Sequence, residues 1–318
     1  MKKTFCTDRE KNMLTKKLLF ILNPNAGVRH ARKMIPELLE IFSDHGYLTT
    51  VCCTRRRGDA TDFARDHAGD ADLVVVSGGD GTLNEVVTGL IQGNHHVPVG
   101  YLPSGSTNDF AAGLGLPGDL LKAAEIAVAG APQSLDIGRF DDRYFCYTAG
   151  FGAFTGVAWS TPQNIKNILG HAAYILEGIK SLGDIRPIHA RIFANDAEYE
   201  DDWIFGAVCN STSLGGILKL DPDIVDMNDG VFETVLIRNP SNPTELAGIL
   251  EAVTTRNYSH PMLQFIRASR LSFRTDTALS WTLDGEYASG GQEIIIENIH
   301  DAFTVMTPEA AKLLSAGK

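Results

Sequence analysis

Glycine residues surround a single aspartate in the segment from Ser77 to Thr82, which reads Ser-Gly-Gly-Asp-Gly-Thr. The segment follows a β-branched run, Leu73 to Ser77, and precedes a helical pattern over residues 83–91. Glycine amides can turn toward a ligand without obstruction by Cβ, and a helix N-terminus adds partial positive charge, so we expect this junction to hold phosphate. The Asp80 carboxylate would repel phosphate unless Mg²⁺ or a substrate hydroxyl lay between them. An Asp-Gly turn that caps the helix is the structural alternative.

Two further junctions between a strand pattern and a helical pattern carry polar residues. Residues 102–110 read Leu-Pro-Ser-Gly-Ser-Thr-Asn-Asp-Phe and supply hydroxyls, an amide and the Asp109 carboxylate. Asn23 to Gly27 follow the first apolar strand, although this loop alone fits a plain turn equally well. Neighbouring parallel strands bring their carboxyl ends to one edge of a sheet, so we expect these loops to converge.

Two acids flank a glycine late in the chain, at Asp284, Gly285 and Glu286. In an extended strand, residues two apart face the same side, so both carboxylates could enter one cleft, unless a turn at Gly285 re-aims Glu286. Such a carboxylate could act as the base that a hydroxyl nucleophile needs. A solvated Asp-Gly hairpin turn is the alternative.

A second acidic stretch contains Asp221, Asp223, Asp226 and Asp229, just before a strand pattern that begins at Val231. Asp226 and Asp229, with a backbone carbonyl such as that of Val231, could bind a divalent ion. A solvated acidic loop explains the same residues equally well.

Several familiar catalytic patterns are absent or out of context. The string Gly113 to Gly118 satisfies GxGxxG, but no strand precedes it and Pro117 lies inside it, which argues against a dinucleotide-binding loop. The sequence contains no Walker A string, no GxSxG and no HExxH. P-loop, α/β-hydrolase and zincin chemistry therefore lose their main support.

The elements that must position these residues change character along the chain. Strand and helix patterns alternate up to residue 129, which predicts a doubly wound, mostly parallel α/β sheet. Beyond it, turn residues separate most strands, which predicts an antiparallel, β-sandwich-like domain. We expect domains at 1–132 and 133–297, packed around a cleft that holds the active site, with 298–318 returning to the first. The first domain has strands at 18–22, 47–53, 73–77 and 97–102 and helices at 34–42, 59–68, 83–91 and 119–129. The second has strands at 134–140, 144–149, 188–194, 203–210, 231–238, 271–274, 279–283 and 293–297, helices at 165–181 and 244–254, and a last strand follows at 303–306.

Composition and charge exclude several classes of protein. The 318 residues are 44% hydrophobic and 21% charged, as in a soluble globular protein. Acidic residues outnumber basic ones by 39 to 28, so the chain would repel a nucleic-acid backbone. No apolar run reaches membrane-spanning length, and the five cysteines form no CxxC pair, so we expect a cytoplasmic protein. The basic first 17 residues are either a solvated tail or an arm that contacts an anionic membrane.

Four motifs in this order resemble the diacylglycerol kinase catalytic-domain family, in its bacterial soluble lipid kinase branch. The motifs are NPxxG at Asn23 to Gly27, GGDGT at Gly78 to Thr82 with Asn84-Glu85, PxG…NDFA at Pro103 to Ala111, and DGE at Asp284 to Glu286. The superfamily also includes sphingosine kinases and, more distantly, NAD kinases. The resemblance covers the chain from about Lys17 to its C-terminal helix.

The resemblance implies an ATP site and a set of metal ligands. Asp80, Asp109 and Asp284 would organise Mg²⁺, and Glu286 would be the general base that deprotonates a lipid hydroxyl. A structural Mg²⁺ would lie at Asp226, Asp229 and the Val231 carbonyl. Family members usually carry threonine where this chain has Ser106, and a serine hydroxyl can substitute for it. The residues that would bind ATP are Asn23, Pro24, Gly27, Thr54, Gly78, Gly79, Asp80, Gly81, Thr82, Glu85, Gly105, Ser106 and Thr107.

The sequence therefore predicts an ATP- and Mg²⁺-dependent lipid kinase whose acceptor we expect to be diacylglycerol. An NAD kinase-like enzyme and a non-catalytic nucleotide-binding regulator are the alternatives. The partners would be ATP and a lipid alcohol, with transient contact to the inner membrane surface, and the oligomeric state is left open. Apolar residues that would either face the lipid or pack the second domain are Phe151, Phe154, Val157, Trp159, Leu214, Ile217 and Leu218.

Overall fold

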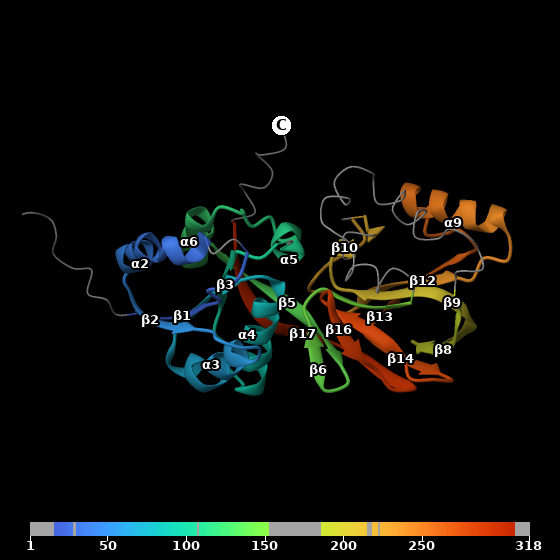
Figure 1. Ribbon diagram of the computed structural model, residues 1–318, viewed down its shortest axis with the longest axis horizontal. Helices are drawn as coiled ribbons and strands as arrows, with labels where there is room; N and C mark the ends of the chain where they lie inside the picture. The colour runs from blue at the N-terminus through green and yellow to red at the C-terminus, as the bar shows by residue number, and fades with distance from the viewer. Residues whose placement is uncertain are drawn as a thin grey trace, which may run out of the picture. The chain divides into compact units, whose positions relative to one another are not determined.

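A computed structural model of the chain describes residues 16–27, 30–106, 108–152, 186–214, 218–221 and 223–308. The chain divides into two compact units (Figure 1). The first unit runs to Gln133 and takes up the chain again from Phe303, and the second spans Ser134 to Ala302. In the described ranges, no helix is long and apolar enough to cross a membrane.

The first unit is built on a parallel sheet. Its strands β1 (Lys16–Leu22), β2 (Tyr47–Cys53), β3 (Leu73–Gly78) and β4 (Val99–Pro103) lie in the order β2-β1-β3-β4. The end of β17 (Glu293–Thr307) adds to β4 in parallel. The carboxyl ends of β1, β3 and β4 therefore reach the same edge of the sheet, where the three polar loops begin.

Helices cover both faces of this sheet, and its central strands are accordingly apolar from Leu18 to Leu22 in β1 and from Leu73 to Val76 in β3. Phe20, Leu22 and Val75 pack with α2 (Ile35–Asp44) and α6 (Leu120–Ala129) in one core cluster. The alternate strand residues are also buried, and α3 and α4 contact β1 and β3. The remaining helix bounds are α1 (His30–Lys33), α3 (Asp59–His67), a 3₁₀ turn (Ala68–Asp70), α4 (Asp80–Gln92) and α5 (Asp109–Gly113).

The second unit is an antiparallel β-sandwich. Its long strand β9 (Ala197–Cys209) pairs with β8 along its first half and with β7 and β12 along its second, so one strand belongs to both layers. The other strands are β5 (Ala131–Phe140), β6 (Arg143–Phe145), β7 (Thr148–Gly152), β8 (Ile188–Ala194), β12 (Phe232–Arg238), β13 (Leu263–Ala268), β14 (Arg270–Thr275), β15 (Ser280–Leu283), β16 (Glu286–Ser289) and the first part of β17, and a short pair is formed by β10 (Ser213–Leu214) and β11 (Leu218–Lys219).

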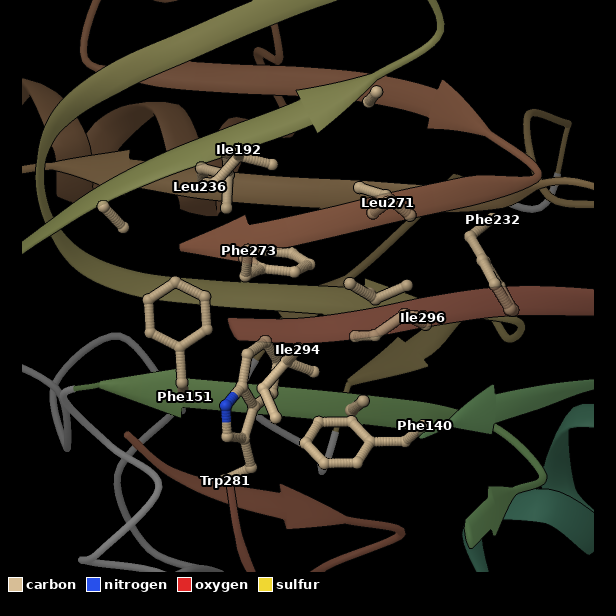
Figure 2. Close-up of a cluster of buried hydrophobic side chains, with 14 of the residues drawn as sticks. Phe140, Phe151, Ile192, Phe232, Leu236, Leu271, Phe273, Trp281, Ile294 and Ile296 are labelled. Carbon is tan, nitrogen blue, oxygen red and sulfur yellow. The ribbon is translucent and has the colours of Figure 1, made fainter. Parts of the chain in front are cut away.

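Aromatic rings fill the space between the two layers (Figure 2). Trp281 lies within about 5 Å of Phe140, Phe151 and Phe273, in edge-on contacts with 4.8 to 5.1 Å between ring centroids. A second apolar layer forms where α9 (Pro243–Thr255) places Ile249 and Ala252 among outer-face residues of β9 and β12. The α/β unit followed by an antiparallel β-sandwich confirms the predicted fold class.

Three strand predictions were wrong in detail. The strand predicted over 144–149 is two strands, because the amides of Cys146 and Tyr147 donate to the Asp284 carboxylate instead of to a ladder. The strands predicted at 293–297 and 303–306 are one strand, β17, which continues through the polar residues near Asp301. Strands β13 and β16 were not predicted. The helix predicted over 165–181 lies outside the described residues.

Candidate active site

The loops after β1, β3 and β4 are held together by backbone hydrogen bonds. The Asn23 amide donates to the Ser77 carbonyl and the Ser104 amide to the Gly78 carbonyl, both at 2.8 Å. The Asn23 side-chain amide donates to Thr82 Oγ1 at 3.1 Å. The three segments that the sequence predicted to converge therefore do lie together in the first unit.

Glycine is required where these loops touch. A Cβ atom at Gly105 would lie 2.6 Å from the Gly79 Cα, so neither backbone could accept a side chain there without moving. Gly27 has φ +52°, and a Cβ at that position would overlap the Ser104 carbonyl oxygen. A Cβ at Gly78 would lie 2.5 Å from the Cβ of Thr82. Backbone amides can thus line the edge of the sheet closely, as phosphate binding requires.

Asp80 is the first residue of α4, with its side chain fixed from two sides. It is 9% exposed, and its carboxylate accepts hydrogen bonds from the Tyr101 hydroxyl at 3.1 Å and from the Asp109 amide at 2.9 Å. Asp80 therefore connects the loop after β3 to the start of α5. The sequence analysis missed Tyr101. Its hydroxyl is the one polar side-chain group in the apolar strand β4, and that could have indicated a buried hydrogen-bond partner.

Asn108 shapes the loop between Gly105 and Asp109. It adopts a left-handed conformation with φ 53°, and its side chain accepts from the Gly105 amide at 2.9 Å and donates to the Gly105 carbonyl at 3.1 Å. Asp109 then begins α5. Ser106 lies in this loop, and Thr107 lies outside the described residues.

The Glu85 side chain, on α4, binds the N-terminus of the neighbouring helix α3. Its carboxylate accepts from the Gly58 amide at 2.9 Å and the Ala60 amide at 3.3 Å, at the N-terminus of α3. Thr54, at the end of β2, is buried, and its amide donates to the Leu22 carbonyl at 2.9 Å. Glu85 thus ties α4 to the N-terminus of α3, and Thr54 ties the end of β2 to β1, while contact of either residue with a nucleotide stays a prediction.

In the second unit, Asp284 and Gly285 form the two-residue turn between β15 and β16. Both have positive φ, 48° and 81°, and Leu283 pairs directly with Glu286. The Asp284 carboxylate is 8% exposed and accepts three backbone amides, from Cys146 at 2.7 Å, Tyr147 at 2.9 Å and Thr148 at 3.1 Å. Glu286 is the exposed first residue of β16. The hairpin turn considered from the sequence is therefore present, and it separates the directions of the two acids.

The acidic loop before β12 is organised by an aspartate that the sequence analysis missed. Asp136 is 1% exposed and accepts from the His300 ring at 2.8 Å, the Asp301 amide at 3.0 Å and the Gly230 amide at 2.7 Å. The hydrogen bond to Asp136 raises the pKa of His300 above its ordinary value. In the sequence, Asp136 is a single acidic residue within a strand pattern, and nothing near it in the chain indicates these partners.

The candidate metal residues in this loop already have partners. Asp229 Oδ1 accepts from the Val231 amide at 3.1 Å, and its other oxygen pairs with Arg267. Asp226 accepts from the Asn228 amide at 3.0 Å. In the part of the chain that the structure describes, no group of three histidine, cysteine or acidic side chains has the arrangement of a metal site. A metal site formed by the carboxylates of Asp226 and Asp229 and the carbonyl of Val231 stays a prediction.

Of the apolar residues proposed to face a lipid, Phe151 does not. It is fully buried in the sandwich core, against Phe273 and Trp281. This result favours the packing alternative at that position, because a ring enclosed by the core is not available to a ligand. The side chains of the remaining candidates, Phe154, Val157, Trp159, Leu214, Ile217 and Leu218, lie outside the described residues.

Comparison with known proteins agrees with the two units. Residues 17–140 match the diacylglycerol kinase catalytic domain, and residues 149–307 match the YegS C-terminal NAD kinase beta sandwich-like domain. A diacylglycerol kinase of Bacillus subtilis is 31% identical over 301 residues, which cover 94% of this chain and 99% of the relative. The chain belongs to the diacylglycerol kinase family. It is therefore a kinase that phosphorylates an alcohol group.

Other family members agree in length and in fold. A diacylglycerol kinase of Staphylococcus epidermidis is 30% identical over 299 residues, 93% of each chain. A crystal structure titled as a putative diacylglycerol kinase from Bacillus anthracis superposes with a TM-score of 0.78 at 23% identity, over 96% of this chain and 99% of that one. Membership in this kinase family implies the use of ATP and argues against the non-catalytic regulator.

Proposed function

We propose that this kinase transfers the γ-phosphoryl group of ATP to the hydroxyl of a lipid, diacylglycerol, in a reaction that needs Mg²⁺. The observation that carries the proposal is the meeting of three glycine-lined loops around Asp80 at one sheet edge. The names of the relatives support diacylglycerol as acceptor. Phosphoryl transfer needs mainly positioning and charge neutralisation, which such an edge can provide.

The nucleotide is proposed to bind through the backbone of these loops. Amides of the segment from Gly78 to Thr82 and the N-terminus of α4 would face its phosphates. The absence of Cβ atoms at Gly79 and Gly105 lets the two loops pack against each other, which brings their backbone amides to the same edge of the sheet. Asn23, Pro24, Gly27, Thr54, Glu85, Ser106 and Thr107 complete the proposed ATP-binding set.

The acids of the first unit fit a divalent cation. Asp80 has a buried, fixed carboxylate beside the glycine-lined turn, and Asp109 starts the next helix, so oxygen donors of the type that Mg²⁺ prefers adjoin the phosphate loop. Bound Mg²⁺ would neutralise charge on the phosphates. We propose that Asp284 contributes from the second unit, where three amides fix its carboxylate. A second, structural ion is proposed at Asp226, Asp229 and the Val231 carbonyl.

Glu286 is proposed as the general base. Its carboxylate would take the proton from the lipid hydroxyl as that oxygen attacks the γ-phosphorus, and the bond from the γ-phosphorus to the bridging oxygen would break to release ADP. The turn at Asp284 and Gly285 orients this side chain, since it fixes the first residue of β16 against β15.

The domain assignment follows from these roles. We propose that residues 1–132 form the nucleotide-binding domain, with 298–318 packed on it, and that 133–297 form the lipid-substrate domain. The protein would work in the cytoplasm and reach its lipid by transient contact with the inner membrane surface. Liposome co-sedimentation of a Leu214→Asp, Leu218→Asp double variant tests this contact, which unchanged pelleting would exclude for these positions.

The experiment for the catalytic assignment is Glu286→Gln. We expect turnover to fall by about 10²- to 10⁴-fold while ATP binding, measured by calorimetry, is retained. Glu198→Gln, at an exposed position of β9, is the matched control and should leave turnover unchanged. Wild-type turnover in Glu286→Gln would remove Glu286 from the role of base.

A further inference from the structure

The hydroxyl group of Tyr101 is a buried polar group that the proposed reaction does not use. Tyr101 lies in β4 and is 1% exposed. A Cβ atom at the preceding Gly100 would overlap the Cβ of Ala127, so Gly100 faces α6. Because the side chains of a strand alternate between faces, Tyr101 points to the opposite face of the sheet. There its hydroxyl reaches Asp80, the first residue of α4.

Packing of the Tyr101 ring fixes the position of this hydroxyl. The ring centroid lies 6.4 Å from that of Phe110 in α5, and Phe110 stacks on Phe303 with 6.3 Å between their centroids. All three rings are buried. The phenolic oxygen is attached rigidly to its ring, so the contacts of the ring set the place of the oxygen. A phenylalanine at position 101 would therefore keep the packing and lose only the hydroxyl.

Two acceptors compete for the single proton of this hydroxyl. Asp80 Oδ1 lies 3.1 Å from the hydroxyl oxygen, and Asn108 Oδ1 lies 3.4 Å from it. A phenolic hydroxyl carries one hydrogen and donates it to one acceptor at full strength. The Asp80 oxygen is closer and belongs to an ionised group, which makes it the stronger acceptor. Asn108 is the second acceptor within reach.

Both acceptors also hold the loop that follows β4. Asn108 Oδ1 accepts from the Gly105 amide at 2.9 Å, and the Asn108 side-chain amide donates to the Gly105 carbonyl at 3.1 Å. The other oxygen of Asp80 accepts from the Asp109 amide at 2.9 Å. The Tyr101 hydroxyl thus joins the Asp80 carboxylate to the segment from Gly105 to Asp109 at both of its ends.

A change of charge at Asp80 changes how this proton is shared. The Asp80 carboxylate becomes a weaker acceptor when a divalent cation draws charge from its oxygens. The Tyr101 hydroxyl then donates more to Asn108, the residue that closes the loop on Gly105. A loop that is fixed before a ligand arrives loses less conformational freedom on binding, so its affinity for the ligand rises.

We propose that the Tyr101 hydroxyl couples cation binding at Asp80 to nucleotide binding at the loop from Gly105 to Asp109. The inference rests on the proposed function, because it takes Asp80 as a Mg²⁺ ligand and this loop as part of the ATP site. Tyr101 is a positioning residue that acts through Asp80 and Asn108. The coupling is reciprocal, so bound nucleotide raises the affinity for Mg²⁺ by the same factor.

Calorimetric titration with the β,γ-imido analogue of ATP, with and without Mg²⁺, measures this coupling. In the wild type, Mg²⁺ should tighten binding of the analogue. Tyr101→Phe should reduce this gain by about 5- to 10-fold, while affinity without Mg²⁺ changes little. Tyr258→Phe is the matched control, because it removes a hydroxyl that accepts from the Asp221 amide at 3.2 Å in the second unit. It should keep the wild-type gain, and a wild-type gain in Tyr101→Phe would overturn the proposal.

The same titration in an Asp80→Asn background tests whether Tyr101 acts through Asp80. Adding Tyr101→Phe should then cause no further loss of the gain, because the charge that the hydroxyl responds to is already absent. Additive losses would show that Tyr101 acts independently of Asp80 and would overturn the proposal. A wild type that gains no affinity from Mg²⁺ would contradict the proposed Mg²⁺ site itself, and with it this inference.

Turnover measured against Mg²⁺ concentration gives a second readout, which a merely structural role would not produce. Excess Mg²⁺ should restore turnover in Tyr101→Phe, because the Asp80 carboxylate is still present, and should not restore it in Asp80→Asn. The wild type and Tyr258→Phe should share one Mg²⁺ requirement. Turnover in Tyr101→Phe that stays low at saturating Mg²⁺ and ATP would indicate a damaged site instead of a lost coupling and would overturn the proposal.

Discussion

Asp80 in the first unit and Asp284 in the second are both buried at turns, and they are held in different ways. Asp80 accepts from a hydroxyl on β4 and from the amide that starts α5, so it links two loops of the sheet edge. Asp284 accepts three successive amides from one segment, residues 146–148, and replaces the ladder bonds missing between β6 and β7. Asp80 thus joins two loops of the sheet edge, where we propose that it also binds Mg²⁺, whereas Asp284 fixes the backbone of one segment next to Glu286 in addition to its proposed metal role.

The largest effect is expected from Asp80→Asn. Asparagine keeps an acceptor oxygen for only one of the two donors, the Tyr101 hydroxyl and the Asp109 amide, and it removes the negative charge, so we expect kcat to fall by about 10²- to 10⁴-fold. A titration with Mg²⁺ should show a raised requirement. Asp196→Asn, in the exposed turn between β8 and β9, is the control. An unaltered Mg²⁺ requirement would count against a metal role for Asp80.

The glycine contact between the loops gives the next prediction. In Gly105→Ala, the new methyl group would meet the Gly79 backbone at 2.6 Å, so the loops must separate. We expect kcat/KM for ATP to fall by about 10- to 100-fold, as a displacement of about 1 Å can cause. Gly118→Ala is a matched control, because nothing lies within 4 Å of its added Cβ. Equal kinetics in the two variants would show that the close approach is not needed.

Asp284→Asn should act mainly on stability. Asparagine keeps one acceptor oxygen for two of the three backbone N–H groups, but its amide nitrogen would face the third, and the negative charge that strengthens all three hydrogen bonds is lost, so we expect the free energy of unfolding to fall by about 3 kcal/mol. Asp141→Asn is the comparison, since Asp141 also has positive φ at a turn but its carboxylate accepts from the exposed Ile295 amide at 3.1 Å. Urea unfolding of both variants measures the two losses of unfolding free energy. The loss in Asp284→Asn should be several times the loss in Asp141→Asn. Equal losses in the two variants would show that the three amides at Asp284 add no more stability than the single amide at Asp141.

A smaller, pH-dependent effect is expected at Glu233 in the sandwich. Burial raises the pKa of this carboxyl to about 7, against the opposing effect of Arg267, and its Oε2 has no hydrogen-bond partner. Because the folded-state pKa is raised, stability from this group is present below about pH 4.5 and is lost as pH rises toward 7.

Glu233→Gln does not titrate, so its stability relative to the wild type should increase by about 1–2 kcal/mol between pH 4.5 and pH 7.5. Chemical denaturation at several pH values measures this change. A constant difference between the two proteins across the range would show that the carboxyl titrates normally.

Local patterns in the sequence were sufficient where neighbours along the chain decide the structure. The apolar runs of β1 and β3 and the glycines around Asp80 marked the parallel sheet and the edge where its loops meet, and the bounds of β2 and β8 were predicted as observed. Residues that act through distant partners were not predictable. Tyr101 is 21 positions from Asp80, Asp136 is 164 positions from His300, and the break between β6 and β7 depends on a carboxylate 138 positions from Cys146. Periodicity contains no information about such contacts.

The most direct test of the account is ³²P transfer from γ-labelled ATP to lipid vesicles by the wild type, with Asp80→Asn and Glu286→Gln in parallel. The vesicles would contain diacylglycerol, a sphingoid base or phosphatidylglycerol, each in turn. We predict Mg²⁺-dependent label in phosphatidic acid from the diacylglycerol vesicles, and at least ~100-fold less label with either variant. Label in no lipid, or equal label with wild type and both variants, would contradict the account.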